Sequence, residues 1–335
     1  MQFNEDPRMN PPKVSILIVS WNTREILRDC LRTVYEQTKD VRFEVIVVDN
    51  ASQDGSAEMV KKDFPQAVLL ANTANRGFAA ANNQGIEAAK GRYVLLLNPD
   101  TLILDGAIDK MVSFAEAHAA AAAVACRVLN ADKTWQPTCF LFPSALSLLI
   151  AALYLNRLWP RNRFCGRERM TWWDGLDARA VDVVAGCFIL VRREAIERVG
   201  VLDETYFMYG EEADWCYRFQ KAGWKVLYTP IAQIVHLGGV SSAQVKGPMC
   251  LQLRASILLF LRKHEGLASY IPACAFVSLF FLLRLPLWLA KAVLSGGANS
   301  ESRENVRTYA AGCWRALYGW RALCVKKQTE TPTCG

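Results

Sequence analysis

The stretch VIVVDNASQDGS, residues Val45–Ser56, decides the fold. Its four branched apolar residues predict a buried strand, which we place at Phe43–Val48. The strand ends in the polar pair Asp49-Asn50, and the loop Ala51–Ser56 then leads into a helix that continues to about Phe64. A buried strand that passes through a polar loop into a helix is typical of a parallel sheet.

The same alternation continues on both sides of this stretch. Further strands are predicted at Val14–Ser20, Ala67–Ala71 and Arg92–Leu97, and helices after Thr23, at Gly77–Lys90 and at Asp105–His118. Strands that alternate with helices of about 10 to 15 residues predict an α/β fold with a mostly parallel sheet and helices on both faces. In such folds ligands bind beyond the carboxyl ends of the strands. Polar loops follow those ends at Trp21-Asn22, Asp49-Asn50, Asn72–Arg76 and Asn98-Pro99-Asp100.

The second half of the chain is less regular. Strands are predicted at Val181–Val184, Phe188–Val191, Lys225–Tyr228 and Ala232–Val235, and helices from Arg193, at Glu211–Ala222 and at Leu251–Arg262. The apolar stretch Phe140–Trp159 is followed by the basic and aromatic stretch Pro160–Arg179. We interpret residues 140–179 as an insertion over the site or as a surface that lies on a membrane.

Composition and missing motifs exclude several classes of protein. With 335 residues, 52% of them hydrophobic and 21% charged, the chain is neither disordered nor collagenous nor a coiled coil. The sequence has no GxxxxGK[ST], GxGxxG or GxSxG motif, which argues against a P-loop enzyme, a dehydrogenase and a serine hydrolase. The eleven Cys form no CxxC pair, so no zinc site is predicted. No nucleic-acid partner is predicted, because the interleaved aromatic and basic motifs of a base reader are missing.

Two carboxylates at strand ends could carry chemistry by their type alone. Asp49 could accept the N3–H of uracil or thymine, which cytosine lacks, and Asp54 reads more simply as a cap and turn before the next helix. Asp100 is placed to coordinate Mg²⁺ or Mn²⁺ between itself and diphosphate oxygens, since these ions need few protein carboxylates. Taken alone, Asn98-Pro99-Asp100 also fits a plain turn.

As a set, the motifs resemble those of the family 2 glycosyltransferases of GT-A fold. Val45–Ser56, NRGFAAANNQG at Asn75–Gly85 and LLLNPD at Leu95–Asp100 occur in the family's order and spacing. Four motifs of the second half resemble those of the bacterial rhamnosyltransferase-like branch. They are VDVVAG at Val181–Gly186, the residues Arg192–Glu194, LDETYFMYGEEADWCYR at Leu202–Arg218 and HLGGVS at His236–Ser241. The resemblance covers roughly Val14 to Glu265.

The resemblance implies a binding site for a nucleotide sugar and a metal. Asp49 would contact the base, and the nucleotide-sugar pocket would be lined by Asn22, Asn50, Arg76, Gly77, Asn82, Asn98 and Asp100. Asp100 matches the last Asp of the family's DxD motif, whose first Asp is Asn98 here. Asp100 and His236 would hold Mg²⁺ or Mn²⁺.

The resemblance also implies a catalytic base at the start of a helix. Inverting transfer needs a base that deprotonates the acceptor hydroxyl as it attacks the anomeric carbon. Glu212 falls where the family has its catalytic Asp, and Glu211 and Asp214 stay alternatives, because Asp214 lies on the same helix face as Glu211. The helix N-terminus is expected to keep these carboxylates ionised.

The carboxyl-terminal region predicts contact with a membrane. Leu267–Ala290 could span a bilayer, but Arg284, Pro272 and Pro286 interrupt it. Arg284 and Lys291 lie seven residues apart, on one face of a continuous helix, which favours an interfacial helix or a re-entrant hairpin over a true span or soluble packing. From Arg284 onward eight basic residues face three acidic ones, which suits an anionic membrane surface.

Together these observations predict a domain order. Residues 1–13 are predicted to form a polar tail, and residues 14–265 are predicted to form a GT-A domain. This domain has a nucleotide-binding half at 14–130 and an acceptor half at 131–265, which contains the insertion 140–179. Residues 266–335 form an apolar and basic helical region at the membrane.

The hypothesis is an inverting glycosyltransferase on the cytoplasmic face of a bacterial inner membrane, bound there peripherally or monotopically. The resemblance implies a dTDP- or UDP-linked donor, with rhamnose as the sugar, and a lipid-linked saccharide or growing cell-surface polysaccharide as acceptor. Residues 100 and 212 would then act on one sugar–diphosphate bond. A processive synthase would carry a Gln-x-x-Arg-Trp motif, which this chain lacks. The alternative from another class is a non-catalytic nucleotide-sugar-binding or scaffold protein.

Overall fold

The computed structural model describes residues 11–238, 246–295 and 300–324. The chain divides into two compact units. The first unit contains residues 1–139, 175–207 and 214–241, and the second contains residues 140–174, 208–213 and 242–335. Each unit has its own packing and is treated by itself.

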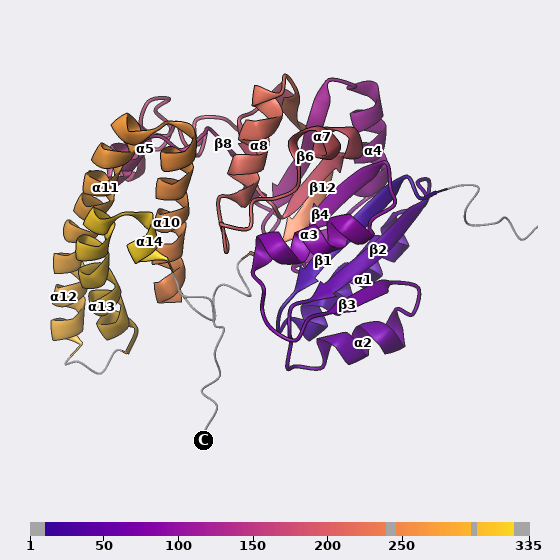
Figure 1. Ribbon diagram of the computed structural model, residues 1–335, viewed down its shortest axis with the longest axis horizontal. Coiled ribbons are helices and arrows are strands. Elements are labelled where there is room, and N and C mark those ends of the chain that lie inside the picture. Colours follow the sequence, from indigo (N-terminus) through magenta and orange to yellow (C-terminus); the bar gives the residue numbers. More distant parts are fainter. Residues whose placement is uncertain (1–10, 239–245, 296–299, 325–335) are drawn as a thin grey trace, which may run out of the picture. The chain divides into compact units, whose positions relative to one another are not determined.

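The first unit is built on a sheet whose described strands run in the order β3-β2-β1-β4-β11-β6-β12-β5 (Figure 1). Their bounds are β1 Val14–Ser20, β2 Phe43–Asp49, β3 Val68–Ala71, β4 Tyr93–Leu97, β5 Thr101–Ile103, β6 Ala121–Leu129, β11 Phe188–Arg192 and β12 Lys225–His236. The short strands β7 (Trp135–Gln136) and β9 (Arg179–Ala180) pair with β6 and β12. Strands β8 (Cys139–Phe140) and β10 (Val183–Val184) lie outside this sheet.

Parallel pairing aligns the ends of the central strands. Strand β1 pairs in parallel with β2 and with β4, and β2 pairs in parallel with β3. Ser20 lies opposite Asp49, and Asp49 lies opposite Ala71, so the polar loops after these strands start at one edge. Strand β11 runs antiparallel to β4 and β6, while β6 and β12 are parallel. The predicted mostly parallel α/β sheet is confirmed.

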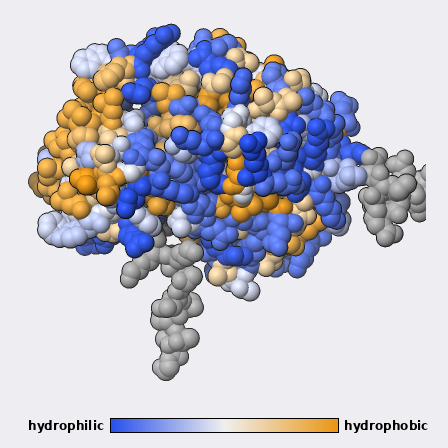
Figure 2. All heavy atoms as spheres, turned by 45° about the horizontal axis from the view of Figure 1, so that its top comes forward, coloured by the Kyte–Doolittle hydropathy of each residue, from blue (hydrophilic) through white to orange (hydrophobic). Residues whose placement is uncertain are grey.

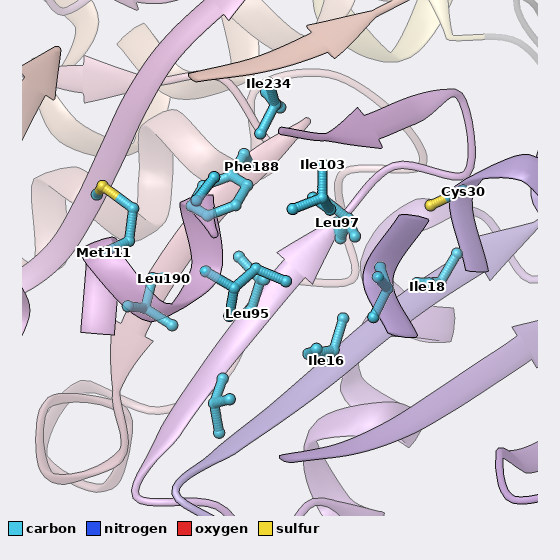
Figure 3. Close-up of a cluster of buried hydrophobic side chains, with 14 of the residues drawn as sticks. Ile16, Ile18, Cys30, Leu95, Leu97, Ile103, Met111, Phe188, Leu190 and Ile234 are labelled. Carbon is cyan, nitrogen blue, oxygen red and sulfur yellow. The ribbon is translucent and has the colours of Figure 1, made fainter. Parts of the chain in front are cut away.

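Helices cover both faces of this sheet, as predicted. The first unit contains α1 Arg24–Gln37, α2 Ser56–Asp63, α3 Phe78–Ala88, α4 Ala107–Ala117 and α7 Arg193–Val199. Ile16 and Ile18 of β1 share one buried cluster with Cys30 of α1 and Met111 of α4 (Figure 3). Leu17 points to the opposite face of the pleat, where α3 approaches so closely that a Cβ at Gly85 would lie 3.1 Å from its Cδ1.

Strand β12 differs from the prediction of two strands at Lys225–Tyr228 and Ala232–Val235. It is continuous over Lys225–His236, with a shift in its register against β6 between Thr229 and Gln233. Pro230 lies in that interval and has no N–H to donate to the ladder. The irregularity is therefore absorbed as a local bulge, and the strand continues to His236.

The regular structure of the second unit is mainly helical, and its described residues 159–174 form turns and irregular segments. It contains α5 Ala145–Ala152, α6 Leu155–Leu158, α10 Lys246–His264, α11 Leu267–Leu282, α12 Leu285–Leu294, α13 Ser300–Arg315, the 3₁₀ helix η1 Ala316–Tyr318 and α14 Trp320–Leu323. Helix α11 contacts α5, α10 and α13. Residues 140–174, which we predicted as part of an insertion, therefore pack with the carboxyl-terminal helices.

The apolar segment is broken at Arg284, which corrects one expectation. Helix α11 ends at Leu282 and α12 begins at Leu285. Arg284 is buried, and its guanidinium donates to the carbonyl oxygens of Ala151 (2.7 Å) and Ala152 (3.1 Å), the last residues of α5. Lys291, in contrast, is exposed. Arg284 therefore does not form an exposed basic surface with Lys291, because it satisfies the carboxyl-terminal carbonyls of a neighbouring helix.

Candidate functional site

The loops after β1 and β2 are tied together by Asn22. Its backbone N–H donates to Ser52 Oγ (2.9 Å), and its Oδ1 accepts from the N–H of Gln53 (2.8 Å). Both Asn22 (φ 52°) and Ala51 (φ 65°) adopt the left-handed region, which is uncommon for residues other than glycine. Strained backbone of this kind collects at ligand-binding edges, where the surrounding contacts hold it.

One carboxylate oxygen of Asp49 has no hydrogen-bond donor among the described residues. Its side chain is buried, and Oδ2 accepts from the backbone N–H of Ser52 (3.0 Å). The other oxygen, Oδ1, is buried without a hydrogen bond from any described residue. An unsatisfied buried acceptor costs about 1–3 kcal/mol, so this position favours a ligand that brings an N–H group.

Asn50 and Gly77 shape the backbone of the next loop. Asn50 Oδ1 accepts from the N–H of Arg76 (3.0 Å), and its Nδ2 donates to Asn75 Oδ1 (2.8 Å). Gly77 has φ 82°, and a Cβ there would lie 2.7 Å from the carbonyl oxygen of Phe207. The Arg76 side chain is exposed. Asn50 and Gly77 therefore fix the loop that carries Arg76.

Two polar residues near this edge have internal partners. Asn82 is buried, and its Nδ2 donates to the carbonyl oxygen of Phe78 (2.9 Å) within α3. Asp54 accepts from the N–H of Arg24 (2.8 Å) at the start of α1 and from the N–H of Ser56 (3.1 Å). Burial would raise the pKa of Asp54, but the hydrogen bonds from Ser56 and Arg24 outweigh it and lower the pKa. Asp54 is thus a turn residue before α2, whose N-cap is Gly55, and it also binds the first N–H of α1.

Asp100 and His236 meet through the pairing of β5 with β12. Thr101 lies opposite His236 in this antiparallel pair, and the Leu237 N–H donates to the Asp100 carbonyl oxygen (2.9 Å). Asp100 is 5% exposed, and its Oδ1 lies 3.2 Å from His236 Nε2. Asn98 Nδ2 lies 3.3 Å from the same ring nitrogen. The structure therefore brings Asn98, Asp100 and His236 together, although 136 positions separate Asp100 from His236.

The Asp100–His236 pair fits a divalent cation. The described ranges contain no group of three or more His, Cys, Asp or Glu side chains that could enclose a metal. Mg²⁺ needs no such cage, because it binds one or two protein groups and completes its shell with phosphate oxygens and water. Ligand atoms at adjacent octahedral positions, each about 2.1 Å from the ion, stand about 3 Å apart. The observed 3.2 Å suits two such positions.

Gln136 is a polar residue at this site that the sequence reasoning missed. Its Oε1 lies 2.7 Å from His236 Nδ1, and its Nε2 donates to Asn130 Oδ1 (2.8 Å). It belongs to β7, which pairs with the end of β6. Neither element was predicted, and no motif marks this glutamine.

The predicted acidic pair begins α8, Glu211–Lys221. The turn before it is strained, with Tyr209 at φ 66° and Gly210 at φ 89°. Ser256 Oγ of α10 donates to the carbonyl oxygen of Met208 (3.0 Å), which anchors this turn within the second unit.

Glu211 and Glu212 differ in their environment. Glu211 is 3% exposed, whereas Glu212 is half-buried. Burial and, second, the negative charge of Glu212 raise the pKa of Glu211 well above its ordinary value. Desolvation thus acts against the expected effect of the helix N-terminus, which was to keep Glu211 ionised. Its burial and raised pKa make Glu211 the weaker of the two candidates for the base.

Asp214 has a structural role. It is fully buried, and its Oδ2 accepts from Arg218 Nε (2.7 Å). The Arg218 guanidinium also donates to the carbonyl oxygens of Val199 and Val201, both at 2.7 Å. Asp214 thus orients an arginine that fastens α8 to the chain after α7, and we remove it from the catalytic candidates.

As the pH rises, a Glu211→Gln variant is expected to become more stable than the wild type. Below about pH 4.5 Glu211 is protonated in both the folded and the unfolded chain. Above that pH the unfolded chain releases the proton while the folded chain keeps it, so the free energy of unfolding of the wild type falls. Gln carries no such penalty. Denaturant unfolding at about pH 4.5 and about pH 7.5 measures the difference. The control is Glu197→Gln, because Glu197 is exposed. If both variants showed the same difference in free energy of unfolding between the two pH values, the raised pKa of Glu211 would be contradicted.

Comparisons with known proteins agree with this arrangement. The profile of the glycosyl transferase family 2 matches residues 15–200. An N-acetylglucosaminyl-diphospho-decaprenol L-rhamnosyltransferase of Mycobacterium tuberculosis is 30% identical over 234 residues, which is 66% of this chain and 76% of that protein. The O-antigen biosynthesis protein RfbC of Myxococcus xanthus is 26% identical over 235 residues, 69% of this chain and 18% of that protein.

Solved structures share the fold. The mannosyltransferase PcManGT from Pyrobaculum calidifontis, in complex with GDP-Man and Mn²⁺, aligns with a TM-score of 0.54 at 18% identity, over 93% of this chain and 86% of that one. GalNAc-T7 with UDP, GalNAc and Mn²⁺ aligns with a TM-score of 0.54 at 14% identity, over 76% of this chain and 48% of that one. The GT-A arrangement predicted from the motifs is confirmed.

Proposed function

Because the chain belongs to glycosyl transferase family 2, we propose that it transfers rhamnose, with inversion, from a nucleotide-diphosphate sugar to a lipid-linked saccharide or growing cell-surface polysaccharide. The observation that carries this proposal is the 3.2 Å approach of the buried Asp100, just before β5, to the half-buried His236 at the end of β12. The mycobacterial relative, whose name specifies rhamnose and a decaprenol-linked acceptor, supports the choice of sugar and acceptor.

The donor is held at its base and at its diphosphate. Asp49 Oδ1 accepts the N3–H of uracil or thymine, and Asn22, Asn50 and Gly77 keep the surrounding loops in place. The exposed Arg76 is available to the diphosphate. Asp100 and His236 would hold Mg²⁺ or Mn²⁺, and that ion would supply positive charge to the departing diphosphate. The side-chain amide nitrogen of Asn98 lies 3.3 Å from His236 Nε2.

Glu212 is the proposed base for the acceptor hydroxyl. It is half-buried at the start of α8, whereas Glu211 beside it is buried and has a raised pKa. Glu212 is therefore the more accessible carboxylate and the better candidate for the base. A positioned carboxylate takes the hydroxyl proton as the oxygen attacks the anomeric carbon, and the diphosphate leaves from the opposite face.

Asp49 predicts a preference among nucleotide bases. Cytosine has a lone pair where uracil and thymine have N3–H, so a CDP-sugar would leave Asp49 Oδ1 unsatisfied. We expect UDP- or dTDP-sugars to bind at least about tenfold more tightly than the CDP-sugar, and Asp49→Asn to narrow that ratio. Isothermal titration with the three donors measures it. Asp63→Asn, on the exposed end of α2, is the control, and equal affinities in the wild type would exclude Asp49 as a base reader.

The second unit supports attachment to a membrane. The described residues include one helical segment long and apolar enough to cross a bilayer, Leu267–Leu294. Within it, none of the residues of α12, LPLWLAKAVL, is buried, and Leu294 is 87% exposed. Hydrophobic residues gather on the surface formed by the second unit's helices (Figure 2). Leu285, Trp288 and Ala292 of α12 are half-buried on the side that contacts α13, and its other residues are exposed. An apolar helix with so much exposed surface suits insertion among acyl chains.

We place the protein peripherally or monotopically on an anionic cytoplasmic leaflet, with α12 as the inserted element. Arg284, at the junction between α11 and α12, is buried and tied to α5, so this end of α12 is held by protein. Lys291 lies 4.6 Å from the Trp288 ring centroid, a pairing suited to the headgroup region.

Polar substitutions in α12 are expected to weaken vesicle binding. Replacing Leu287, Val293 and Leu294 by Ser removes apolar surface that insertion would bury, so binding to phosphatidylglycerol vesicles should fall at least about tenfold. Co-sedimentation measures the bound fraction. The matched control replaces Val68, Val201 and Ile231, exposed apolar residues of the first unit, by Ser. Equal binding of the α12 variant and the wild type would exclude insertion by this helix.

A panel of donors tests the function as a whole. Thermal shifts with UDP-, dTDP- and GDP-sugars, each with and without Mn²⁺, identify the base and sugar and show whether the metal is required. A transfer assay with a polyprenyl-diphosphate saccharide then follows the product. Donor binding without transfer or hydrolysis would favour the non-catalytic binding or scaffold protein over the enzyme.

A further inference from the structure

We infer that Gln136 is a positioning residue for the metal site, because a hydrogen-bond relay from Asp132 through Thr134, Asn130 and Gln136 holds a proton on His236 Nδ1 and leaves Nε2 free to bind the cation. The inference concerns residues of the first unit that no motif marks. Its functional meaning, though not its geometry, rests on the proposed metal-dependent transfer.

The direction of the relay is set at its outer end. The Asp132 carboxylate can only accept, and Thr134 donates to its Oδ1 through both the hydroxyl (2.6 Å) and the backbone N–H (3.0 Å). The hydroxyl hydrogen is therefore committed to Asp132. Thr134 Oγ1 consequently accepts, and Asn130 Nδ2 donates to it at 2.9 Å. The Asn130 amide is thereby fixed with its oxygen on the other side.

A second anchor fixes the Gln136 amide independently. Gln136 Nε2 donates to Asn130 Oδ1 at 2.8 Å and also faces the carbonyl oxygen of His236 at 3.5 Å. A backbone carbonyl can only accept, so both neighbours require the nitrogen of the amide on that side. Gln136 Oε1 then faces His236 Nδ1 at 2.7 Å. An amide oxygen cannot donate, and therefore Nδ1 carries the hydrogen.

As a consequence, His236 Nε2 is already in the protonation state that a metal ligand requires. In neutral imidazole a proton on Nδ1 leaves a lone pair on Nε2. That nitrogen lies 3.2 Å from Asp100 Oδ1 and 3.3 Å from Asn98 Nδ2. With Nε2 unprotonated, Asn98 Nδ2 can donate to its lone pair, while the lone pair and the Asp100 carboxylate repel each other. The site therefore attracts a cation and needs no change of tautomer to bind it.

The fold explains why these residues meet. Strands β6 and β7 form a hairpin in which Val128 pairs with Gln136, and its turn passes through Lys133 at φ 64°. Strand β6 also pairs in parallel with β12, where Leu129 lies opposite Val235. The hairpin end is thus held next to His236, and the relay residues Asn130, Asp132 and Thr134 all lie in its turn.

Nitrogen NMR can read the tautomer directly, since the chain has three His. In protein labelled with ¹⁵N-histidine, the signal missing from His236→Gln identifies the residue. At a pH where the ring is neutral and without metal, we expect a protonated Nδ1 and an unprotonated Nε2. In Gln136→Leu the acceptor is lost, and the Nε2–H tautomer should appear. Gln136→Glu, which keeps an acceptor oxygen, should restore the wild-type tautomer.

Binding of Mn²⁺ supplies a second readout. Titration with MnCl₂ in the presence of UDP, followed by electron paramagnetic resonance, should show affinity falling about 10–100-fold in Gln136→Leu and recovering in Gln136→Glu. Gln233→Leu, an exposed glutamine of β12, is the matched control. Thr134→Val removes the hydroxyl that links Asp132 to Asn130, so it should lower the Mn²⁺ affinity by a smaller factor than Gln136→Leu. This variant keeps the test available if Gln136→Leu does not fold.

The outcomes separate the relay from the metal. A wild-type His236 with hydrogen on Nε2, or a Gln136→Leu variant with unchanged tautomer and unchanged Mn²⁺ affinity, would overturn the relay. A wild-type protein that shows the Nδ1–H tautomer, loses it in Gln136→Leu and yet binds no Mn²⁺ would support the relay and refute the metal part of the proposed function.

Discussion

An Asp100→Asn variant is expected to lose at least about 10³-fold in the rate of sugar transfer. The substitution keeps the size of the side chain and leaves the backbone bond from Leu237 to the Asp100 carbonyl intact. It removes the negative charge that, with His236, would hold the cation against the diphosphate. Lewis-acid stabilisation of a departing oxyanion amounts to several kcal/mol, and each 1.4 kcal/mol corresponds to about a tenfold change in rate.

The measurement is kcat at saturating donor, together with Mn²⁺ affinity in the presence of UDP. Both should fall in Asp100→Asn, while the thermal midpoint without ligand should change little. Asp105→Asn is the matched control, because Asp105 is exposed and its φ of 45° is tolerated by Asn. Wild-type turnover in Asp100→Asn would remove Asp100 from the proposed machinery.

A Glu212→Gln variant is expected to separate binding from chemistry. Replacing the proposed base by an amide of similar shape should lower kcat by about 10²–10⁴-fold, since the amide cannot take the acceptor proton. The Kd for the donor should stay within about twofold, because the base acts on the acceptor hydroxyl. Calorimetry gives the Kd, and single-turnover kinetics give the rate of transfer.

The neighbouring variant provides the control for this prediction. Burial raises the pKa of Glu211 well above its ordinary value, which makes it a poor base, so Glu211→Gln should cost less than about tenfold in kcat. If Glu211→Gln were the more damaging substitution, the two residues would exchange roles. A loss of donor affinity in Glu212→Gln as large as its loss in kcat would instead place this residue in the donor pocket.

The central strands could be predicted because their sequences are locally unambiguous. Strands β1, β2 and β4 are runs of branched or large apolar residues, and each is buried on both faces. Their polar ends at Asp49 and Asp100 follow from the same pattern, since parallel strands present their carboxyl ends at one edge. The family motifs lie on these loops, which is why most of the proposed donor site was found from sequence.

Strand β6 shows where local pattern fails. Its sequence AAAVACRVL is rich in alanine, which has the highest helix propensity and no preference for strands. It forms a strand because it lies between β11 and β12, where small side chains fit a sheet covered by helices. Gln136 was missed for the same reason, since its hairpin exists only as a partner of β6.

The local sequence determined which residues form strand ends, which loops are polar and which carboxylates are available for chemistry, because these depend on neighbours within a few positions. The tertiary structure decided which of those groups meet and in what state. Pairing of β5 with β12 set His236 beside Asp100, burial raised the pKa of Glu211, and the carbonyl oxygens at the end of α5 bound the guanidinium of Arg284. Burial and hydrogen-bond partners arise from contacts between distant segments, and the free energy of an ionisable group follows those contacts more than its position in the chain.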